Sequence, residues 1–346
     1  MTRVRVFVPA DYDAWVAGSN RCYPDYPWSV QEMRHEDDVF DRTRFFALRL
    51  VAEHDGALVG GAHVHHKPSR FHPDRYNFDL WVVPEARRGG HGSALHDEAV
   101  AALRGRDALA ATGGVKESMQ DGVEFTRKRG WREVRRDWES RLPVAGFDFA
   151  AFASADVRIA NDGIRISTLA EELTKDAGAE GKAYELSQEL RKDVPAIDPP
   201  TAETIEEWRD HWISAPSFLA DAFFVAIDRE GRWLGLSNVE RSVEDPTFAW
   251  QGLTGVRREA RGRGIAMALK LRTVRHAQGM RVDHIKTWNA QQNGPMLAIN
   301  EALGFERQPA WIALELALRG SSPAPRAPSE VPRTVTPVGL FRCSTR

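Results

Sequence analysis

Apolar positions in the first half of the chain follow strand and helix periods in turn. Strands are expected at 4–8, 45–53, 57–66, 78–83, 109–112 and 131–142, where apolar residues alternate or form short runs. Helices are expected at 10–23, 29–42 and 93–104, with a further helix ending near 125–130. The pattern therefore predicts a mixed α/β layer structure rather than an all-helical or all-strand domain.

The second half repeats this order. Strands are expected at 164–167, 223–227, 233–241, 248–256, 284–288 and 311–317, and helices at 169–191, 201–214, 265–279 and 295–303. We therefore expect two similar domains, 1–145 and 163–318, joined by a linker at 146–162. Residues 319–346 are rich in Pro, Ser and Arg and are expected to form a tail without a core of its own.

A glycine- and arginine-rich turn lies between the strand at 248–256 and the helix at 265–279. Glycine lets backbone approach a ligand closely, and the first N–H groups of a helix attract anions. Arginine side chains can add to that attraction. The turn at 257–264, which we call the second glycine loop, is thus a candidate pyrophosphate site, although an arginine-rich surface turn explains the same residues.

The spacing of arginine and glycine residues in this turn occurs twice in the chain. Arg87-x-x-Gly90-x-Gly92 stands 174 residues before Arg261-x-x-Gly264-x-Ala266, and a strand-ending valine precedes each arginine by five residues. We call 84–92 the first glycine loop. A strand–loop–helix unit that recurs at half the chain length predicts an internal duplication.

The Arg261-x-x-Gly264-x-Ala266 pattern resembles the acyl-CoA loop of the GNAT N-acetyltransferases, so the chain resembles a tandem member of that family. The resemblance implies acetyl-CoA as co-substrate, no metal, and transfer of an acetyl group to a primary amine of a small molecule. The residues that it implies for acetyl-CoA binding are Thr254, Gly255, Val256, Arg261, Gly262, Arg263, Gly264, Ile265, Ala266, Asn289 and Asn293. A second possible loop comprises Val82, Val83, Arg88, Gly89, Gly90, Gly92 and Ser93.

The two halves differ where the acyl chain is expected to bind. Asn293 falls where the family places a carboxamide beside the pantetheine arm, and capping of the following helix is its alternative role. Met119 takes that position in the first half and offers no such bonds. We therefore expect the active site in the second half and a degenerate, structural or substrate-shaping first half.

The catalytic groups are less clear from the sequence. Candidate bases are Glu240, Glu244 and Asp245, each of which is also explained as a solvated turn residue. Asp79 is a further candidate, and a polar residue at a strand edge is its alternative role. Many GNAT enzymes carry a tyrosine as general acid four residues before a closing glycine, but this chain has Asn300 and Thr126 there. We therefore assign no general acid.

The composition of the chain limits which functions and binding partners remain possible. The chain has 28% charged residues, a formal net charge of -2 and two cysteines without metal-ligand spacing. We expect a cytoplasmic monomer or homodimer that binds neither nucleic acid nor membrane. A catalytically silent acetyl-CoA-binding protein, a mycothiol-synthase-like acetyltransferase and a nucleic-acid-binding protein that uses the loop arginines are the alternatives.

Overall fold

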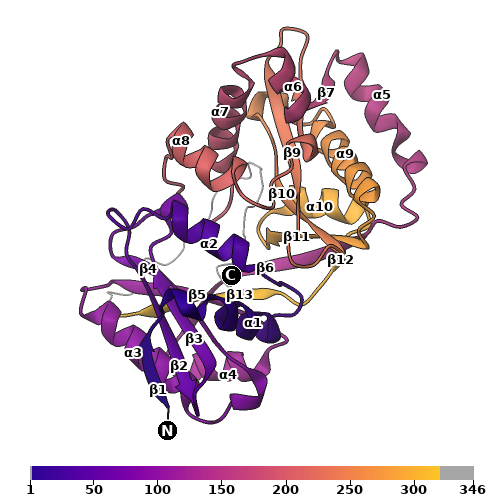
Figure 1. Cartoon of the computed structure of the whole chain (residues 1–346). Helices are drawn as coiled ribbons and strands as arrows, with labels where there is room; N and C mark the ends of the chain where they lie inside the picture. The colour runs from indigo at the N-terminus through magenta and orange to yellow at the C-terminus, as the bar shows by residue number, and fades with distance from the viewer. Residues whose placement is uncertain (1, 320–346) are drawn as a thin grey trace, which may run out of the picture. The chain divides into compact units, whose positions relative to one another are not determined.

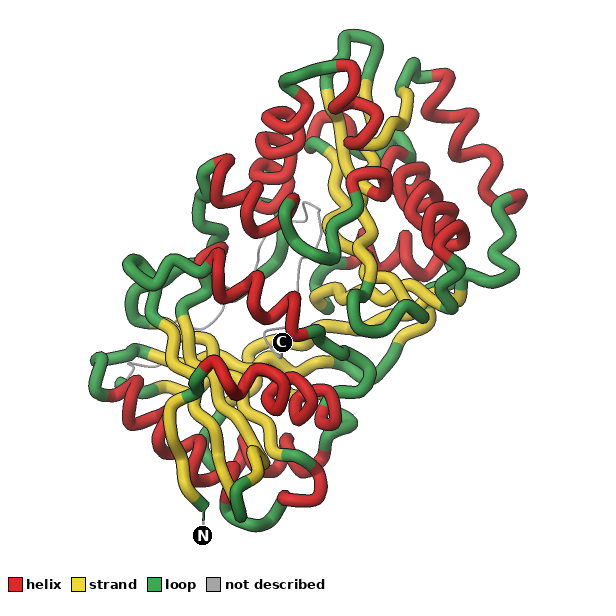
Figure 2. Tube along the Cα trace, viewed as in Figure 1, coloured by secondary structure: helices red, strands yellow, loops and turns green. Residues whose placement is uncertain are grey.

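The computed structural model describes residues 2–319, so the predicted tail lies, except for its first residue, outside the described residues. The chain forms two compact units. Of the described residues, unit 1 contains 2–136 and 309–319, and unit 2 contains 137–308. Both units alternate strands and helices (Figure 2), so the predicted α/β class is confirmed.

Unit 1 is built on one mixed sheet with the strand order β1-β2-β3-β4-β5-β13. Its strands are β1 (Arg3–Val6), β2 (Ala47–His54), β3 (Ala57–His65), β4 (Arg75–Val82), β5 (Ala110–Lys116) and β13 (Trp311–Ala317). All neighbours in this order are antiparallel except β4 and β5, which are parallel.

Helices cover both faces of the unit 1 sheet (Figure 1). One face carries α1 (Tyr12–Cys22) and α2 (Val30–Val39), and the other carries α3 (His91–Arg104) and α4 (Gln120–Lys128). The alternation of strand side chains divides the core accordingly. Ala62 and Val64 pack in the cluster of α3, while Val51 and Trp81 pack with Trp15 of α1.

Unit 2 repeats this plan with the strand order β6-β11-β10-β9-β8-β7. Its strands are β6 (Arg132–Pro143), β7 (Arg165–Thr168), β8 (Phe223–Ile227), β9 (Trp233–Arg241), β10 (Phe248–Val256) and β11 (His284–Ala290), with the short β12 (Glu306–Arg307) beside β6. Its helices are α5 (Ala153–Asn161), α6 (Leu169–Lys175), α7 (Ala179–Arg191), α8 (Ile205–Trp208), α9 (Ile265–Met280) and α10 (Gly294–Ala302). The parallel pair here is β10 and β11.

Several local predictions need correction. The expected linker at 146–162 contains α5, whose Ile159 is buried in the core with Ile265 of α9. The expected helix at 169–191 is two helices, because the chain leaves helical geometry at Asp176. The segment at 201–214 is helical only from Ile205 and ends in a π-helical turn. Each helix of the described chain is too short or too polar to span a bilayer.

The chain crosses between the units twice, which the predicted domain boundaries do not include. From Asp137 onward β6 pairs with β11 of unit 2, although β6 follows α4 of unit 1 in sequence. Conversely, β13 follows α10 of unit 2 in sequence and pairs with β5 of unit 1 along its whole length. Ile312 and Leu314 of β13 are buried in the core of unit 1. Neither sequence half therefore contains all the strands of one unit.

This crossing predicts that residues 1–145 alone do not fold. They lack β13, so the edge of β5 that pairs with β13 is left without a partner strand. The core also loses Ile312 and Leu314. We expect an aggregation-prone chain without a cooperative thermal transition by circular dichroism.

A rearranged chain is the control. Residues 1–136 followed by a short Gly/Ser linker and residues 309–319 restore β13, and the gap is small because Arg136 and Ala310 both bond to Glu117. We expect this chain to melt cooperatively. A cooperative transition in 1–145 of equal midpoint would contradict the inferred dependence on β13.

Candidate functional site

Each unit has a parallel strand pair that separates partway along. In unit 1, β4 and β5 pair only from Arg75 to Asn77 on the β4 side. In unit 2, β10 and β11 pair only from Phe248 to Trp250 on the β10 side. Beyond these three positions the strands diverge, and each first strand runs into a glycine loop. Parallel strands that part in this way leave a wedge in which a ligand can lie between two backbones.

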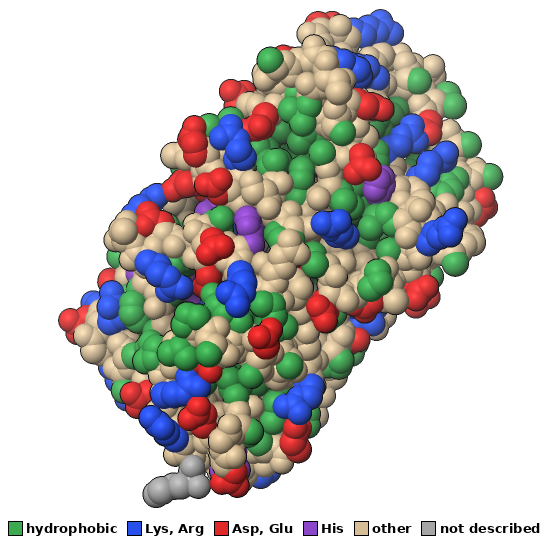
Figure 3. Space-filling model, in the orientation of Figure 1, with side chains coloured by type: hydrophobic (Ala, Val, Ile, Leu, Met, Phe, Trp, Pro, Cys, Tyr) green, Lys and Arg blue, Asp and Glu red, His purple; other side chains and the backbone are tan. Residues whose placement is uncertain are grey.

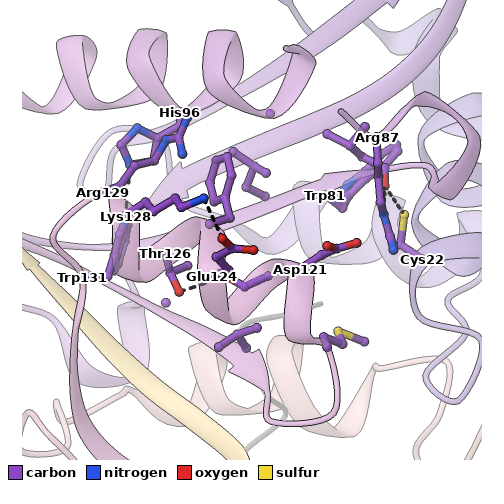
Figure 4. Close-up of a pocket in the computed structure, with 18 of the residues that line it drawn as sticks. Cys22, Trp81, Arg87, His96, Asp121, Glu124, Thr126, Lys128, Arg129 and Trp131 are labelled. Carbon is purple, nitrogen blue, oxygen red and sulfur yellow. Dashed lines mark hydrogen bonds and ion pairs between the residues drawn. The ribbon is translucent and has the colours of Figure 1, made fainter. Parts of the chain in front are cut away.

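The wedge of unit 1 opens into a pocket of about 820 Å³. Its walls come from β4, β5, α3, α4 and the first glycine loop (Figure 4). Gly113 and Gly114 of β5 line one wall without filling the pocket with side chains. Gly90 and Gly92 line the wall formed by the first glycine loop. The volume is in the range of pockets that hold cofactor-sized ligands.

Both glycine loops turn into a helix in the same way. Gly90 and Gly264 are the N-cap residues of α3 and α9, with φ of 85° and 84°, and neither helix start has a side-chain cap. Such φ values favour glycine. The first N–H groups of a helix lack partners within the helix, so each loop presents donors to an anion.

The loop arginines serve mainly to hold the loops. Arg87 Nε donates to the Val82 carbonyl at 3.2 Å, and Arg261 Nε donates to the Val256 carbonyl at 3.0 Å. These equivalent bonds close each turn onto the end of its strand. Arg87 and Arg261 thus each use Nε to hold the loop, and their contact with a ligand stays a prediction.

Carboxylates of unit 2 also pair with the second glycine loop. Asp193 forms ion pairs with Arg258 and Arg261, and Asp162 accepts from Arg263 at 2.8 Å. The pKa of Asp193 is below its ordinary value, since its burial, which raises the pKa, is outweighed by bonds to the two guanidinium groups. The loop's side-chain charge is therefore largely compensated before any ligand binds.

Asn293 is the most unusual polar residue of unit 2. It is the N-cap residue of α10 but makes no cap bond with its side chain, so the capping alternative is not what the structure has. It is 2% exposed, and neither atom of its carboxamide has a hydrogen-bond partner in the described structure. An orphaned buried carboxamide is costly, so Asn293 is a candidate for hydrogen bonding to a bound molecule. Asn289 differs, because its oxygen accepts from Asn300 at 2.6 Å.

A β-bulge distinguishes unit 2 from unit 1 at the same place. The pairing of β10 with β9 shifts register between Gln251 and Thr254. The corresponding pairing of β4 with β3 is regular from Gly60 to His65. A bulge takes backbone groups out of the ladder, so β10 can offer an N–H to a ligand carbonyl in the wedge.

Of the four carboxylate candidates, Glu240 and Asp79 are held within sheets. Glu240 is a buried residue of β9 that accepts from Ser217 Oγ at 3.3 Å and Asn238 Nδ2 at 3.4 Å, so the interpretation as a turn residue is wrong. Glu244 is exposed, and Asp245 caps its own turn through Thr247. Asp79 is half-buried in β4, and burial raises its pKa well above the ordinary value.

A small cavity lies beside Glu240 that sequence reasoning does not predict. It has a volume of about 30 Å³, enough for a water molecule. Four aromatic side chains from one stretch of the sequence form part of its wall: Trp208, Trp212, Phe218 and Phe223. Trp250 of β10 and Trp288 of β11 stack on each other with ring centroids 4.9 Å apart.

The comparisons with known proteins agree with this geometry. Residues 12–131 match the model of the Acetyltransferase (GNAT) family. A mycothiol acetyltransferase of Saccharomonospora viridis is 27% identical over 269 residues, which cover 72% of this chain and 76% of that protein.

Two solved structures share the fold over nearly the whole chain. A tandem GNAT protein from the clavulanic acid biosynthesis pathway has a TM-score of 0.71 at 20% identity, covering 93% of this chain and 100% of that one. A GCN5-related N-acetyltransferase from Sphaerobacter thermophilus has a TM-score of 0.65 at 18% identity, covering 93% and 97%. Residues 12–131 thus match the GNAT family, and the chain as a whole shares the fold of tandem GNAT proteins.

Proposed function

We propose that unit 2 transfers an acetyl group from acetyl-CoA to a primary amine of a small molecule. The observation that carries this proposal is Asn293, whose buried carboxamide has both polar atoms unpaired at the end of the wedge between β10 and β11. The pantetheine arm of coenzyme A contains two amides. One of them can donate to Asn293 Oδ1 and accept from Asn293 Nδ2, which relieves both unpaired atoms.

The pyrophosphate would then lie on the second glycine loop. The N–H groups that open α9 supply the donors, and the helix dipole favours negative charge there. Gly262 and Gly264 both have left-handed φ, which turns the loop backbone so that a phosphate can approach it. The contribution of Arg258 and Arg261 is reduced by Asp193, so backbone donors dominate this binding.

The chemical step needs a neutral amine and a polarised thioester. Glu240 accepts the ammonium proton, directly or through a water in the adjacent cavity. A backbone N–H at the β10 bulge polarises the thioester carbonyl. The amine nitrogen then forms the new C–N bond while the C–S bond breaks. The nitrogen then loses its second proton, which reaches the departing thiolate through water, since Asn300 and Thr126 stand at the positions of the usual acid.

We propose the acceptor only as a chemical class, a primary amine of a small molecule. The relative from Saccharomonospora viridis is named for acetylation of a mycothiol compound, and a mycothiol-synthase-like activity is accordingly the alternative acceptor class. Screening a library of amines, including amino sugars with a thiol substituent, for release of free CoA distinguishes these acceptors.

A second binding function is favoured in unit 1. The pocket of about 820 Å³ at the first glycine loop is large enough for an acyl-CoA arm. Met119 lines it in place of an asparagine. We therefore propose weaker acetyl-CoA binding without transfer in unit 1. Nucleic acid is less favoured as a ligand, because the loop arginines are ion-paired and charges of both signs mix on the face in Figure 3.

Replacing each N-cap glycine by valine tests the location. Gly264→Val adds a side chain where the backbone must approach a phosphate, so acetyl-CoA binding to unit 2 should be lost. Gly90→Val is the matched variant, because Gly90 has nearly the same φ. We expect it to remove only the weaker site in isothermal titration calorimetry. Left-handed valine costs about 1–2 kcal/mol in stability, so melting curves must accompany both titrations. Loss of the tighter site in Gly90→Val alone would place catalysis in unit 1.

Glu240→Gln tests the proton acceptor. It keeps the size of the side chain and its bond to Ser217 but removes the base. We expect kcat to fall about 10²–10⁴-fold with little change in the KM for acetyl-CoA. Glu244→Gln is the control, because Glu244 is an exposed carboxylate only four residues away. Equal activity of the two variants in the CoA-release assay would exclude Glu240 as the base.

Asp193→Asn tests the charge compensation of the second glycine loop. Removing this carboxylate frees the guanidinium groups of Arg258 and Arg261 to attract phosphate. We expect tighter acetyl-CoA binding and a steeper weakening of that binding with added salt than in the unmodified protein. Unchanged affinity at low ionic strength would show that these arginines do not reach the ligand.

A further inference from the structure

Three metal-ligating side chains gather in unit 1 outside the acyl-CoA pocket. His63 and His65 are two residues apart on β3, so both project from the same face of the sheet. Asp79 of β4 is directly opposite His63 in the antiparallel register. One ligand atom from each of the three residues lies within 4.8 Å of the other two. They face the side of the sheet that carries α1 and α2.

These side chains have few partners of their own. Both carboxylate oxygens of Asp79 and Nδ1 of His65 are buried and unbonded in the described structure. The recorded contacts of the imidazoles are a stack of the two rings at 4.1 Å and a long bond of 3.5 Å between Asn77 and His65 Nε2. An unpaired carboxylate beside two imidazoles is unfavourable, and a shared cation would relieve it.

We propose that His63, His65 and Asp79 bind a divalent transition-metal ion of the zinc type. Two imidazole nitrogens and one carboxylate oxygen form the donor set that such ions prefer, with remaining positions open to water. Bonds of about 2.0–2.2 Å place ligand atoms about 3–3.5 Å apart, so small side-chain rotations close the site. This binding site is not implied by the GNAT resemblance, for which no metal is expected.

The surrounding charges are compatible with a cation. Arg49 and Arg42 face the cluster, but both form ion pairs with Asp37 of α2. Lys67 and Glu36 also face it and carry opposite charges. The carboxylate of Asp79 is therefore the nearest negative charge that a bound metal would meet.

The equivalent positions of unit 2 carry different chemistry. Counted from Gly60 and Gly235, which each pair with the strand-ending valine, His63 corresponds to Asn238 and His65 to Glu240. Where unit 2 holds the proposed base, unit 1 therefore holds two imidazoles. The proposed metal site is formed by residues of unit 1 alone, and it does not require the proposed transfer reaction in unit 2.

Titration of the metal-free full-length protein with Zn²⁺ and with Co²⁺ tests the proposal. We expect one tight site by calorimetry, a rise in melting temperature with Zn²⁺, and visible absorption from bound Co²⁺. His63→Gln, His65→Gln and Asp79→Asn should each weaken binding at least ~10-fold and reduce the Co²⁺ absorption. Three separate variants keep the test decisive if one of them fails to fold.

The double variant His54→Gln/His91→Gln is the matched control. It removes another neighbouring histidine pair of unit 1, whose ring centroids are 5.1 Å apart. We expect its Zn²⁺ affinity to equal that of the unmodified protein. Absence of stoichiometric binding to the unmodified protein would overturn the proposal. So would equal affinities of the cluster variants and the unmodified protein, or loss of binding in the control alone.

Discussion

The proposed function depends on a parallel strand pair that is hydrogen-bonded for only three positions. In unit 2, β10 and β11 pair from Phe248 to Trp250 and then separate. The separation leaves room between two backbones, directs β10 into the second glycine loop and brings the start of α10, with Asn293, to the far side. A fully paired sheet would satisfy these backbone groups internally and leave no place for an extended ligand.

The opened sheet is stabilised by the strands that flank it. β11 gains its second neighbour from β6, which enters unit 2 at Asp137, and β5 gains its second neighbour from β13. Each wedge therefore has one wall that is held by a strand arriving from the other half of the sequence. A single sequence half therefore does not supply this support.

The sequence predicts those features that depend on residues close together along the chain. The strands at 223–227, 233–241, 248–256 and 311–317 are correct to the residue, because apolar runs between turn signals specify them. It does not predict features that depend on contacts between segments far apart along the chain. No local signal tells that β13 pairs with β5, that Glu240 is buried, or that Asp193 meets Arg261 from 68 residues away. The grouping of His63, His65 and Asp79 likewise depends on strand register, which side-chain spacing along one strand does not reveal.

The two units show how one scaffold can carry two chemistries. Both keep the glycine at the N-cap, the arginine that bonds the strand-ending valine and the short parallel pairing, since these features form the wedge itself. They differ in the backbone of one wedge strand and in side chains around the wedge. The bulge, Asn293 and Glu240 occur in unit 2, whereas unit 1 has a regular ladder, Met119 and the His63–His65 pair. Such differences alter ligand chemistry while the strand–loop–helix order is kept. Hence the family resemblance of unit 1 does not by itself specify what unit 1 binds.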